Sequence, residues 1–427
     1  MLDLLIRHAN FPDGQQDMAL GIKDGLITQV GSDIELSECP AAQAFDAGHH
    51  LLSQAFVDAH FHLDSAQRFG QPRPNQSGTL REGIALWAEL KPSLTRESIE
   101  QSAANYCRWA IANGILAIRT HVDISDPQLL AVEALLAVRE RFKPWLTLQL
   151  VAFPQDGLLR HPGAQENLIR ALDMGVAVIG GIPHFERTAN EGTQSIEWLC
   201  RLAAERGLMV DMHCDESDDP NSRHIETLAA NTIRFGLQGQ VTGSHLTSMH
   251  SMDNDYAAKL MDLMVQADIH VIANPLINIT LQGRHDTYPK RRGMTRVPEL
   301  MAAGLTVAFG QDCVMDPWYS MGSADMLEVA HMGLHVGQMT GQTQVQQCYA
   351  AITTEPAAIL GLPHPGLVPG APADLVLLQA SDPAQALRLR AARLAVFKQG
   401  QCIAQTPPRI AELTLGADKH QIDWRRP

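Results

Sequence analysis

Short apolar runs alternate with helix-patterned stretches through the middle of the chain. Thr95 can cap a helix that stops at Gly114, and an apolar run follows at once. Ser125 or Asp126, with Pro127 at the first helical position, is expected to open the next helix. Eight such runs are predicted strands: the run that begins at Phe56 and residues 115–121, 146–153, 176–179, 208–213, 240–245, 269–273 and 305–309. Repeated right-handed β-α crossovers close most naturally into a barrel, so the predicted fold class is α/β with a (β/α)8 TIM-type barrel.

The two ends of the chain carry short strands and turns instead of this helical rhythm. Before residue 52, apolar runs are separated by turns at Gly14 and Gly25. Beyond Leu362, a Pro- and Gly-rich link that includes Pro365 leads into apolar runs at 373–378, 394–397 and 401–404. We therefore predict a small β-sandwich domain built from residues 1–54 and 363–427, with the barrel formed by residues 55–362.

Composition narrows the classes of partner. The chain has 427 residues with 45% hydrophobic and 19% charged residues, which is typical of a globular protein. Its net charge of -14 opposes binding to nucleic acid, so a nucleobase partner would be a free base. Seven scattered cysteines without a C-x-x-C pair indicate reduced thiols. With no export signal and no apolar run long enough to cross a bilayer, we expect a cytoplasmic protein without a membrane partner.

Two histidines end the first predicted barrel strand. His60 and His62 are one residue apart, and side chains at i and i+2 of a strand point to the same face, so both can reach one metal ion. A single His-x-His is a weak signal that also fits hydrogen-bonded surface histidines. The decisive question is whether other strands end in matching chemistry.

Other predicted strands end in matching chemistry. The active-site groups of a barrel gather at the carboxyl ends of its strands, so groups in these positions are expected to meet. These groups are Gln155 after the third strand, His213 and Glu216 after the fifth, His245 after the sixth and Asp312 after the eighth. Three imidazoles and one carboxylate suit Zn2+ or Fe2+ and leave a position for water. Glu216, three residues after His213, is placed to carry a proton. Lone histidines such as His121 and His184 are expected to be hydrogen-bonded in the barrel mouth.

Longer motifs connect these positions to a known family. They cover residues 60–62, 75–80, 151–155, 182–186, 213–216, 274–276 and 288–293. On these stretches the chain resembles the amidohydrolase superfamily, and within it the bacterial cytosine deaminases. The other zinc deaminase class, with H-x-E and P-C-x-x-C motifs, is not supported, because the cysteine half is absent.

The resemblance assigns roles to individual residues. It implies that one metal ion is bound by four residues, His60, His62, His213 and Asp312. Glu216 would shuttle the proton, and His245 would position the water beside Asp312. Gln155 and the backbone of Leu80 would hold the O2/N1 edge of a pyrimidine, and Trp318 would line the pocket. It also implies a homo-oligomer. The implied reaction is addition of the activated water to C4 of cytosine, protonation of N3 through Glu216 and loss of ammonia.

Cys313 departs from the family pattern, in which a second aspartate follows the metal-binding one. A thiol there makes the wall near C5 of the ring apolar, and burial of one methyl group is worth about 0.8 kcal/mol. We therefore predict activity on 5-methylcytosine as well as cytosine, against the alternative that Cys313 is a neutral variation.

Other functions stay open at this point. Isoguanine or another amino-heterocycle is the alternative substrate. Ring-opening hydrolysis usually uses two metals bridged by a lysine on the fourth strand, and no lysine occurs between Val176 and His184. A binding protein that has lost catalysis is expected to lack Glu216 or one of the ligands, and all are present.

Overall fold

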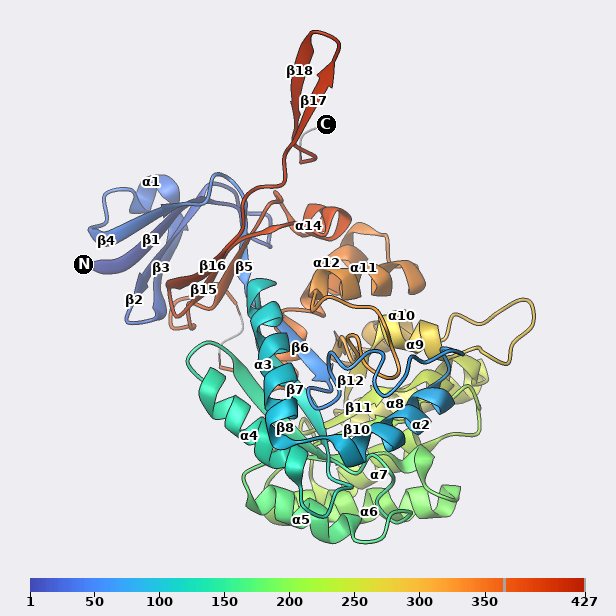
Figure 1. Cartoon of the computed structure of the whole chain (residues 1–427). Coiled ribbons are helices and arrows are strands. Elements are labelled where there is room, and N and C mark those ends of the chain that lie inside the picture. The colour runs from blue at the N-terminus through green and yellow to red at the C-terminus, as the bar shows by residue number, and fades with distance from the viewer. Residues whose placement is uncertain (364–365, 426–427) are drawn as a thin grey trace.

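The computed structural model describes residues 1–363 and 366–425, and its central feature is a closed ring of parallel strands surrounded by helices (Figure 1). The strands are β6 (Phe56–Phe61), β7 (Ile115–Asp123), β8 (Thr147–Phe153), β9 (Val178–Gly181), β10 (Met209–Cys214), β11 (Val241–His245), β12 (His270–Ala273) and β13 (Val307–Phe309). They pair in sequence order, and a parallel bridge between Phe61 and Asp312 joins the last strand to the first. The predicted barrel is confirmed.

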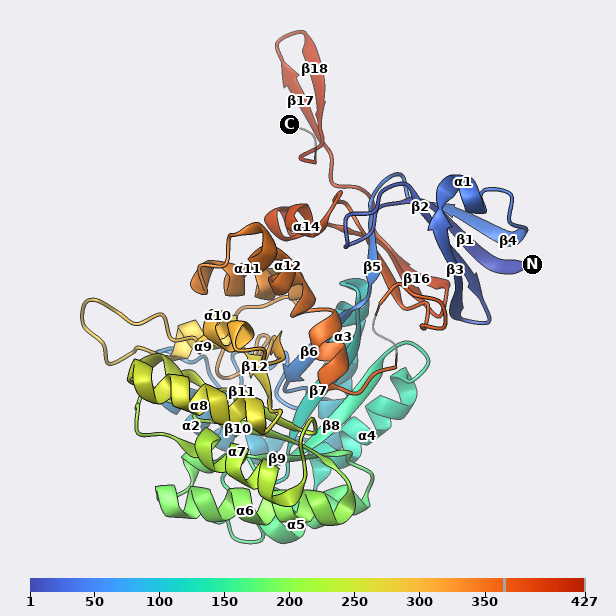
Figure 2. The same ribbon diagram turned by 180° about the vertical axis from the view of Figure 1, so that it is seen from behind.

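Burial on both faces explains why these strands read as continuous apolar runs. Every residue of β6, β7 and β11 is buried, as expected where helices cover a parallel sheet. Figures 1 and 2 show the helices on the outside of the ring. The helices of the barrel are α2 (Leu80–Leu90), α3 (Arg96–Ala112), α4 (Leu130–Phe142), α5 (Ala164–Asp173), α6 (Ala189–Arg206), α7 (His224–Phe235), α8 (Asn254–Gln266), α9 (Pro275–Leu281), α10 (Val297–Ala302), α11 (Met326–Val336), α12 (Gln342–Ala350) and α13 (Thr354–Ile359).

Two predicted helix starts have different outcomes. The Thr95 hydroxyl accepts a hydrogen bond from the Ser98 backbone, so α3 begins where the cap indicated. The helix expected to open at Pro127 begins later, at Leu130. The reason is a turn in which the Asp126 carboxylate accepts the backbone N–H of Gln128, and which ends in a left-handed Leu129 (φ 54°).

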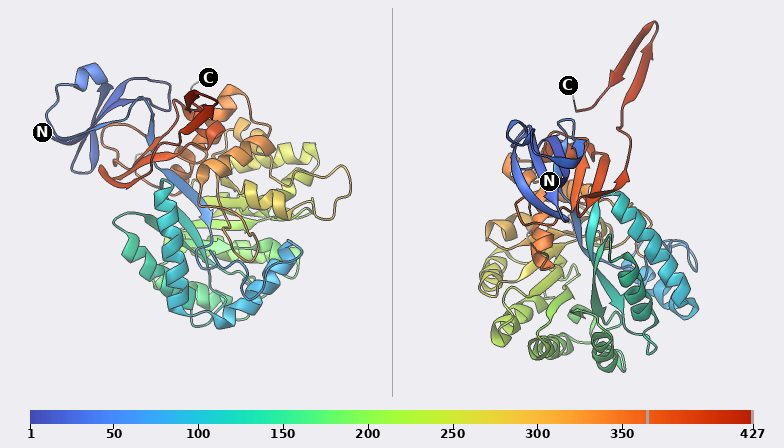
Figure 3. Two further views of the ribbon diagram at one scale, coloured as in Figure 1. Left: turned by 45° about the horizontal axis from the view of Figure 1, so that its top comes forward. Right: turned by 90° about the vertical axis from the view of Figure 1, so that its left-hand side faces the viewer.

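Both chain ends build a two-sheet unit beside the barrel (Figure 3). One sheet has the order β3 (Leu26–Ser32), β2 (Met18–Lys23), β1 (Leu2–Ala9) and β4 (Ala41–Asp46); the other has β16 (Gln401–Gln405), β15 (Arg393–Lys398), β14 (Leu375–Leu378) and β5 (Leu51–Gln54). Apolar residues of both sheets share one core, in which Ile6 and Leu20 meet Leu377 and Phe397. The predicted sandwich from both termini is therefore present.

Some features of the termini were not expected from the sequence. These are the short helices α1 (Asp33–Leu36) and α14 (Pro383–Leu389), and a hairpin of β17 (Ala411–Leu415) and β18 (Asp418–Ile422) that projects away from the rest of the molecule in Figure 1. The domain limits at residues 54 and 363 remain a prediction. Pro365 of the predicted link, and residues 426–427, lie outside the described residues.

Candidate active site at the barrel mouth

The predicted ligand side chains meet at the carboxyl ends of the strands. Asp312 Oδ1 lies 3.4 Å from both His60 Nε2 and His62 Nε2. His62 Nε2 is 3.0 Å from His213 Nε2, and His245 Nε2 is 3.9 Å from Asp312 Oδ2. Donor atoms of His60, His213, His245 and Asp312 all lie within 4.8 Å of one another. The structure thus brings together residues that are up to 252 positions apart, from 60 to 312.

The chemistry of this cluster suits a divalent cation. Burial, together with neighbouring histidines, lowers the pKa values of His60 and His213 well below 6.5, and burial does the same for His62, so the three rings are neutral. His60 Nε2 is buried and has no hydrogen-bond partner in the described part of the chain. Neutral imidazole nitrogens that converge beside a carboxylate are the donor set of a metal site.

His121 belongs to the same cluster, which the sequence analysis missed. Its donor atom lies within 4.8 Å of those of His60, His62 and His213. Asp211 Oδ1 lies 3.6 Å from His121 Nε2, and His121 Nδ1 has no hydrogen-bond partner among the described residues. Its position near the end of β7, the neighbour of β6, was the available signal. His184 Nδ1 is likewise buried without a partner among those residues.

A buried polar network holds the His60 ring from below. The Ser244 hydroxyl is 3.1 Å from His60 Nδ1 and donates to Asp211 Oδ1 at 2.7 Å. Arg119 donates to the other oxygen of Asp211 at 2.9 Å. Burial alone would raise the pKa of Asp211, but its contacts with His121 and Arg119 bring that pKa below its usual value. The charged Asp211 therefore directs the Ser244 proton to itself, which leaves His60 Nδ1 as donor and turns the Nε2 lone pair toward the cluster.

Glu216 and His245 lie side by side above the cluster. Glu216 Oε1 is 3.6 Å from His245 Nδ1, and the Glu216 side chain is 9% exposed. Burial, with the nearby charge of Asp312, raises the pKa of Glu216 well above 4.5. The Asn278 amide donates to His245 Nδ1 at 2.9 Å, which directs the other ring nitrogen toward Asp312. The backbone is left-handed at His245 (φ 75°) and Asp312 (φ 64°), a conformation that is uncommon for residues other than glycine and is often found at functional sites.

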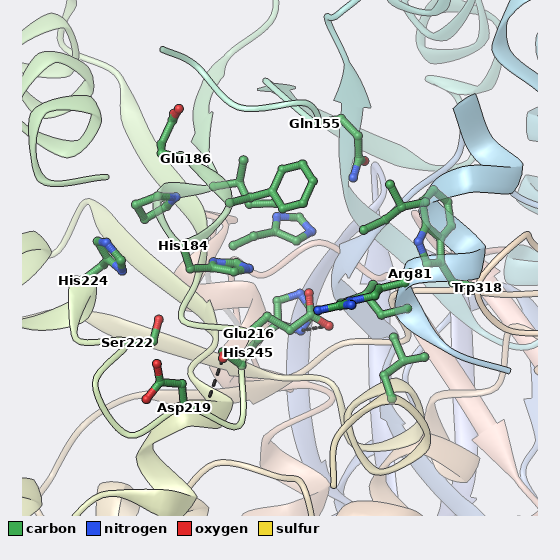
Figure 4. Close-up of a pocket in the computed structure, with 18 of the residues that line it drawn as sticks. Arg81, Gln155, His184, Glu186, Glu216, Asp219, Ser222, His224, His245 and Trp318 are labelled. Carbon is green, nitrogen blue, oxygen red and sulfur yellow. Dashed lines mark hydrogen bonds and ion pairs between the residues drawn. The ribbon is translucent and has the colours of Figure 1, made fainter. Parts of the chain in front are cut away.

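The cluster opens into a pocket of about 530 Å3 that the remaining predicted residues line. Figure 4 shows Gln155 and Trp318 along one side of this pocket and Glu216 with His245 nearer its centre. The predicted lining residues in it are Leu80, Gln155, Glu216, His245, Cys313 and Trp318, together with His62, His213 and Asp312. The pocket can therefore hold a small ring beside the candidate metal centre.

Cys313 forms an apolar part of the wall. It is 5% exposed and packs with Ile277 and Leu281, while Leu80 and Trp318 border the same cluster. Burial raises the pKa of its thiol well above 9, so the side chain is uncharged. This wall offers no charge to a ligand.

Comparisons with known proteins identify the family. A family model described as "Amidohydrolase family" matches residues 43–404, and the chain belongs to this family. The crystal structure of 5-methylcytosine deaminase from Klebsiella pneumoniae liganded with 5-fluorocytosine is 39% identical, covers 97% of this chain and 100% of that chain, and superposes with a TM-score of 0.93. With the buried cluster, this makes the chain a metal-dependent aminohydrolase that acts on C–N bonds.

Two more distant relatives show how broad the family chemistry is. A pterin deaminase of Rhizobium rhizogenes is 30% identical over 407 residues, 94% of this chain and 91% of the relative. An N-isopropylammelide isopropyl amidohydrolase of a Pseudomonas strain is 27% identical over 420 residues, 96% of this chain and 99% of the relative.

Among the described residues, no helix is long and apolar enough to cross a membrane.

Proposed function

We propose that the chain deaminates a free aminopyrimidine base by hydrolysis, converting cytosine and 5-methylcytosine to uracil and thymine with release of ammonia. The coarser statement, that it is a hydrolytic deaminase of an amino-substituted heterocycle, follows from the family and the relatives. The observation that carries the finer proposal is the uncharged Cys313 wall inside the pocket that also holds Gln155 and Glu216.

His60, His62, His213 and Asp312 are the proposed ligands of one Zn2+ or Fe2+ ion. An ion of this kind lowers the pKa of a bound water toward ~7. His121 and His245 are near enough to complete alternative ligand sets, so the assignment among these six residues is part of the proposal.

Glu216 is the proposed proton carrier. Its raised pKa keeps it protonated at a pH where a solvated glutamate has lost its proton, so it can donate to N3 of the ring. The Asn278 amide orients the His245 ring, so that His245 Nε2 lies 3.9 Å from Asp312 Oδ2.

Polar groups on the other side of the pocket select the ring edge. The Gln155 amide can pair with the O2/N1 edge of a pyrimidine. Leu80 is the first residue of α2, so its backbone N–H has no partner within the helix and is available to the same edge. A ring that leaves these groups unpaired binds less well.

A substrate comparison with a variant tests this assignment. Ammonia release from cytosine and 5-methylcytosine is measured with the metal-loaded enzyme, and we expect 5-methylcytosine to be turned over. Cys313→Asp introduces a charge against the methyl group and should lower kcat/KM for 5-methylcytosine relative to cytosine by about tenfold or more. Cys348→Ser, at a buried cysteine of α12 that does not line the pocket, is the matched control. Fast turnover of cytosine with none of 5-methylcytosine would contradict the proposal.

A larger amino-heterocycle is the second candidate. The pocket of about 530 Å3 is roomier than one pyrimidine ring requires, and it extends past Glu216 to His224. One relative is a pterin deaminase. Isoguanine, like cytosine, carries its amino group on a cyclic amidine. Ammonia release from isoguanine or a pterin that exceeds release from both pyrimidines would favour this candidate.

A further inference from the structure

A second cavity, of about 440 Å3, lies between the loop that follows β6 and one side of α3. Its volume is within the ~300–1,000 Å3 range of small-ligand sites. Gln67 and Arg68 line it from the loop, and Ser102, Asn105 and Arg108 line it from α3. We call it the α3 pocket. Every lining residue in the described chain is either neutral or an arginine, so the pocket is basic in a protein of net charge -14.

Arg68 is a buried cation that makes no ion pair within the described residues. It is only 5% exposed, and its guanidinium donates to the Asp64 backbone carbonyl at 3.3 Å and to the Ser102 hydroxyl at 3.1 Å. Both acceptors are neutral, and no ion pair to Arg68 occurs within residues 1–363 and 366–425. Burial lowers its pKa, while the charge of Asp64 acts in the opposite direction. Buried charges are normally paired, and the Asp64 carboxylate does not lie within ion-pair distance of the guanidinium, so a closer negative partner would stabilise Arg68.

Two other side chains of the α3 pocket have hydrogen-bond donors without an acceptor among the described residues. Gln67 Oε1 accepts a hydrogen bond from the Asn105 amide at 2.7 Å, while Gln67 Nε2 is buried with no acceptor among the described residues. In the same part of the chain, the exposed Arg108 makes no hydrogen bond or ion pair. Two guanidinium groups and one amide N–H therefore line a cavity that offers no carboxylate in return.

We propose that the α3 pocket binds a phosphate-type oxyanion, either free or as the phosphate group of a small metabolite. Guanidinium groups bind such oxygens through paired, charge-assisted hydrogen bonds. The site is coupled by the backbone to the barrel mouth, because Gln67 N donates to Val314 O at 3.0 Å, two residues after Asp312. An anion held by Arg68 and Arg108 would join α3 to both segments that carry candidate metal ligands. This inference does not depend on the proposed substrate.

Calorimetric titration of the full chain with inorganic phosphate, repeated at several chloride concentrations, tests the proposal. We expect saturable binding that weakens as chloride is raised. Arg108→Gln should reduce the affinity about tenfold or more, since it removes a charged hydrogen-bond donor from the exposed side of the pocket. Arg68→Gln should do the same, and Arg108→Gln alone suffices if the buried substitution prevents folding.

The control is Arg201→Gln, because Arg201 is an exposed residue of α6 outside this pocket, and it should leave the affinity unchanged. A parallel titration with a nucleoside 5′-monophosphate distinguishes the two sources of the anion, since tighter binding than phosphate identifies a metabolite. Absence of binding at millimolar phosphate would overturn the proposal. So would binding that Arg108→Gln leaves intact, because the anion would then sit elsewhere.

Discussion

Ser244 connects the floor of the barrel to the candidate metal centre through a single hydroxyl. It bridges His60 Nδ1 and the carboxylate of Asp211. Because outer-shell partners of this kind orient a ligating imidazole, we expect Ser244→Ala to weaken Zn2+ affinity by about 10–100-fold. Competition with a chelator of known affinity measures this independently of activity. Ser195→Ala, a buried serine of α6 far along the chain, is the control, and equal affinities in both variants would contradict the assigned role.

His184 should make the protein sensitive to acid. Burial lowers its pKa from 6.5 to about 4, so the folded protein excludes a proton that the unfolded chain takes up. Stability is therefore lost progressively as pH falls from 6.5 toward 4, and by at most about 3 kcal/mol from this one group. In His184→Gln, the midpoint of thermal unfolding should drop less between pH 7 and pH 4.5 than in the wild type. His420→Gln on the exposed hairpin should keep the wild-type drop; an identical drop in His184→Gln would refute the argument.

The strand-end residues of the candidate site were predictable because a barrel collects the carboxyl ends of all its strands. His213 and Asp312 could be placed beside His60 from this rule alone. The contacts of Ser244 and His121 with the cluster were not predicted, since they depend on which rings face these residues across neighbouring strands. Such contacts depend on how the neighbouring strands are paired, and the spacing of residues along one strand does not determine that pairing.

At the scale of elements, α2 and the segment after β13 fix the outer wall of the pocket together. A Cβ atom at Gly83 of α2 would lie 2.3 Å from Trp318 Cδ1, so only glycine permits this approach. Gly83→Ala should shift Trp318 and cost about 1–3 kcal/mol of stability. Misplacement of the ring should lower kcat/KM by about tenfold to 100-fold. Ala85→Ser on the exposed side of the same helix is the control. Full activity of Gly83→Ala would mean that Trp318 does not position the substrate.

Elements with strong periodicity or a capping residue were predicted well, and elements without them were not. The Thr95 cap predicted the start of α3 because its hydroxyl can accept the nearby backbone N–H of Ser98. The start of α4 was misplaced because the Asp126 side chain stabilises a turn before the helix. Pro127 is compatible with such a turn as well as with the first position of a helix. The hairpin β17–β18 carries no core residues, so its weak alternation gave no burial pattern to detect.

At the scale of the whole molecule, one face of that hairpin exposes large apolar side chains on which no other described residue is buried. Ala411 pairs with Ile422, and alternate residues of a strand share a face, so the exposed Leu413 (41%) and Leu415 (60%) lie on the same face as Ile422. Their own partners on this face are His420 and Asp418. An isolated two-stranded hairpin is marginal in water. Figure 1 shows the hairpin extending away from the rest of the chain, and we propose that a second copy of the chain covers this face. The homo-oligomer remains a prediction.

Charge on the apolar face should therefore weaken the assembly. We expect Leu413→Glu with Leu415→Glu to lower the molar mass of the particle in solution, measured by light scattering after size-exclusion chromatography, because two carboxylates would be buried without partners. Thr414→Glu places its charge on the opposite face of the same strand, so it should keep the wild-type mass. Deaminase activity per folded chain reports whether the barrel is intact in each variant. A wild-type mass in the double variant would show that the hairpin does not hold the copies together.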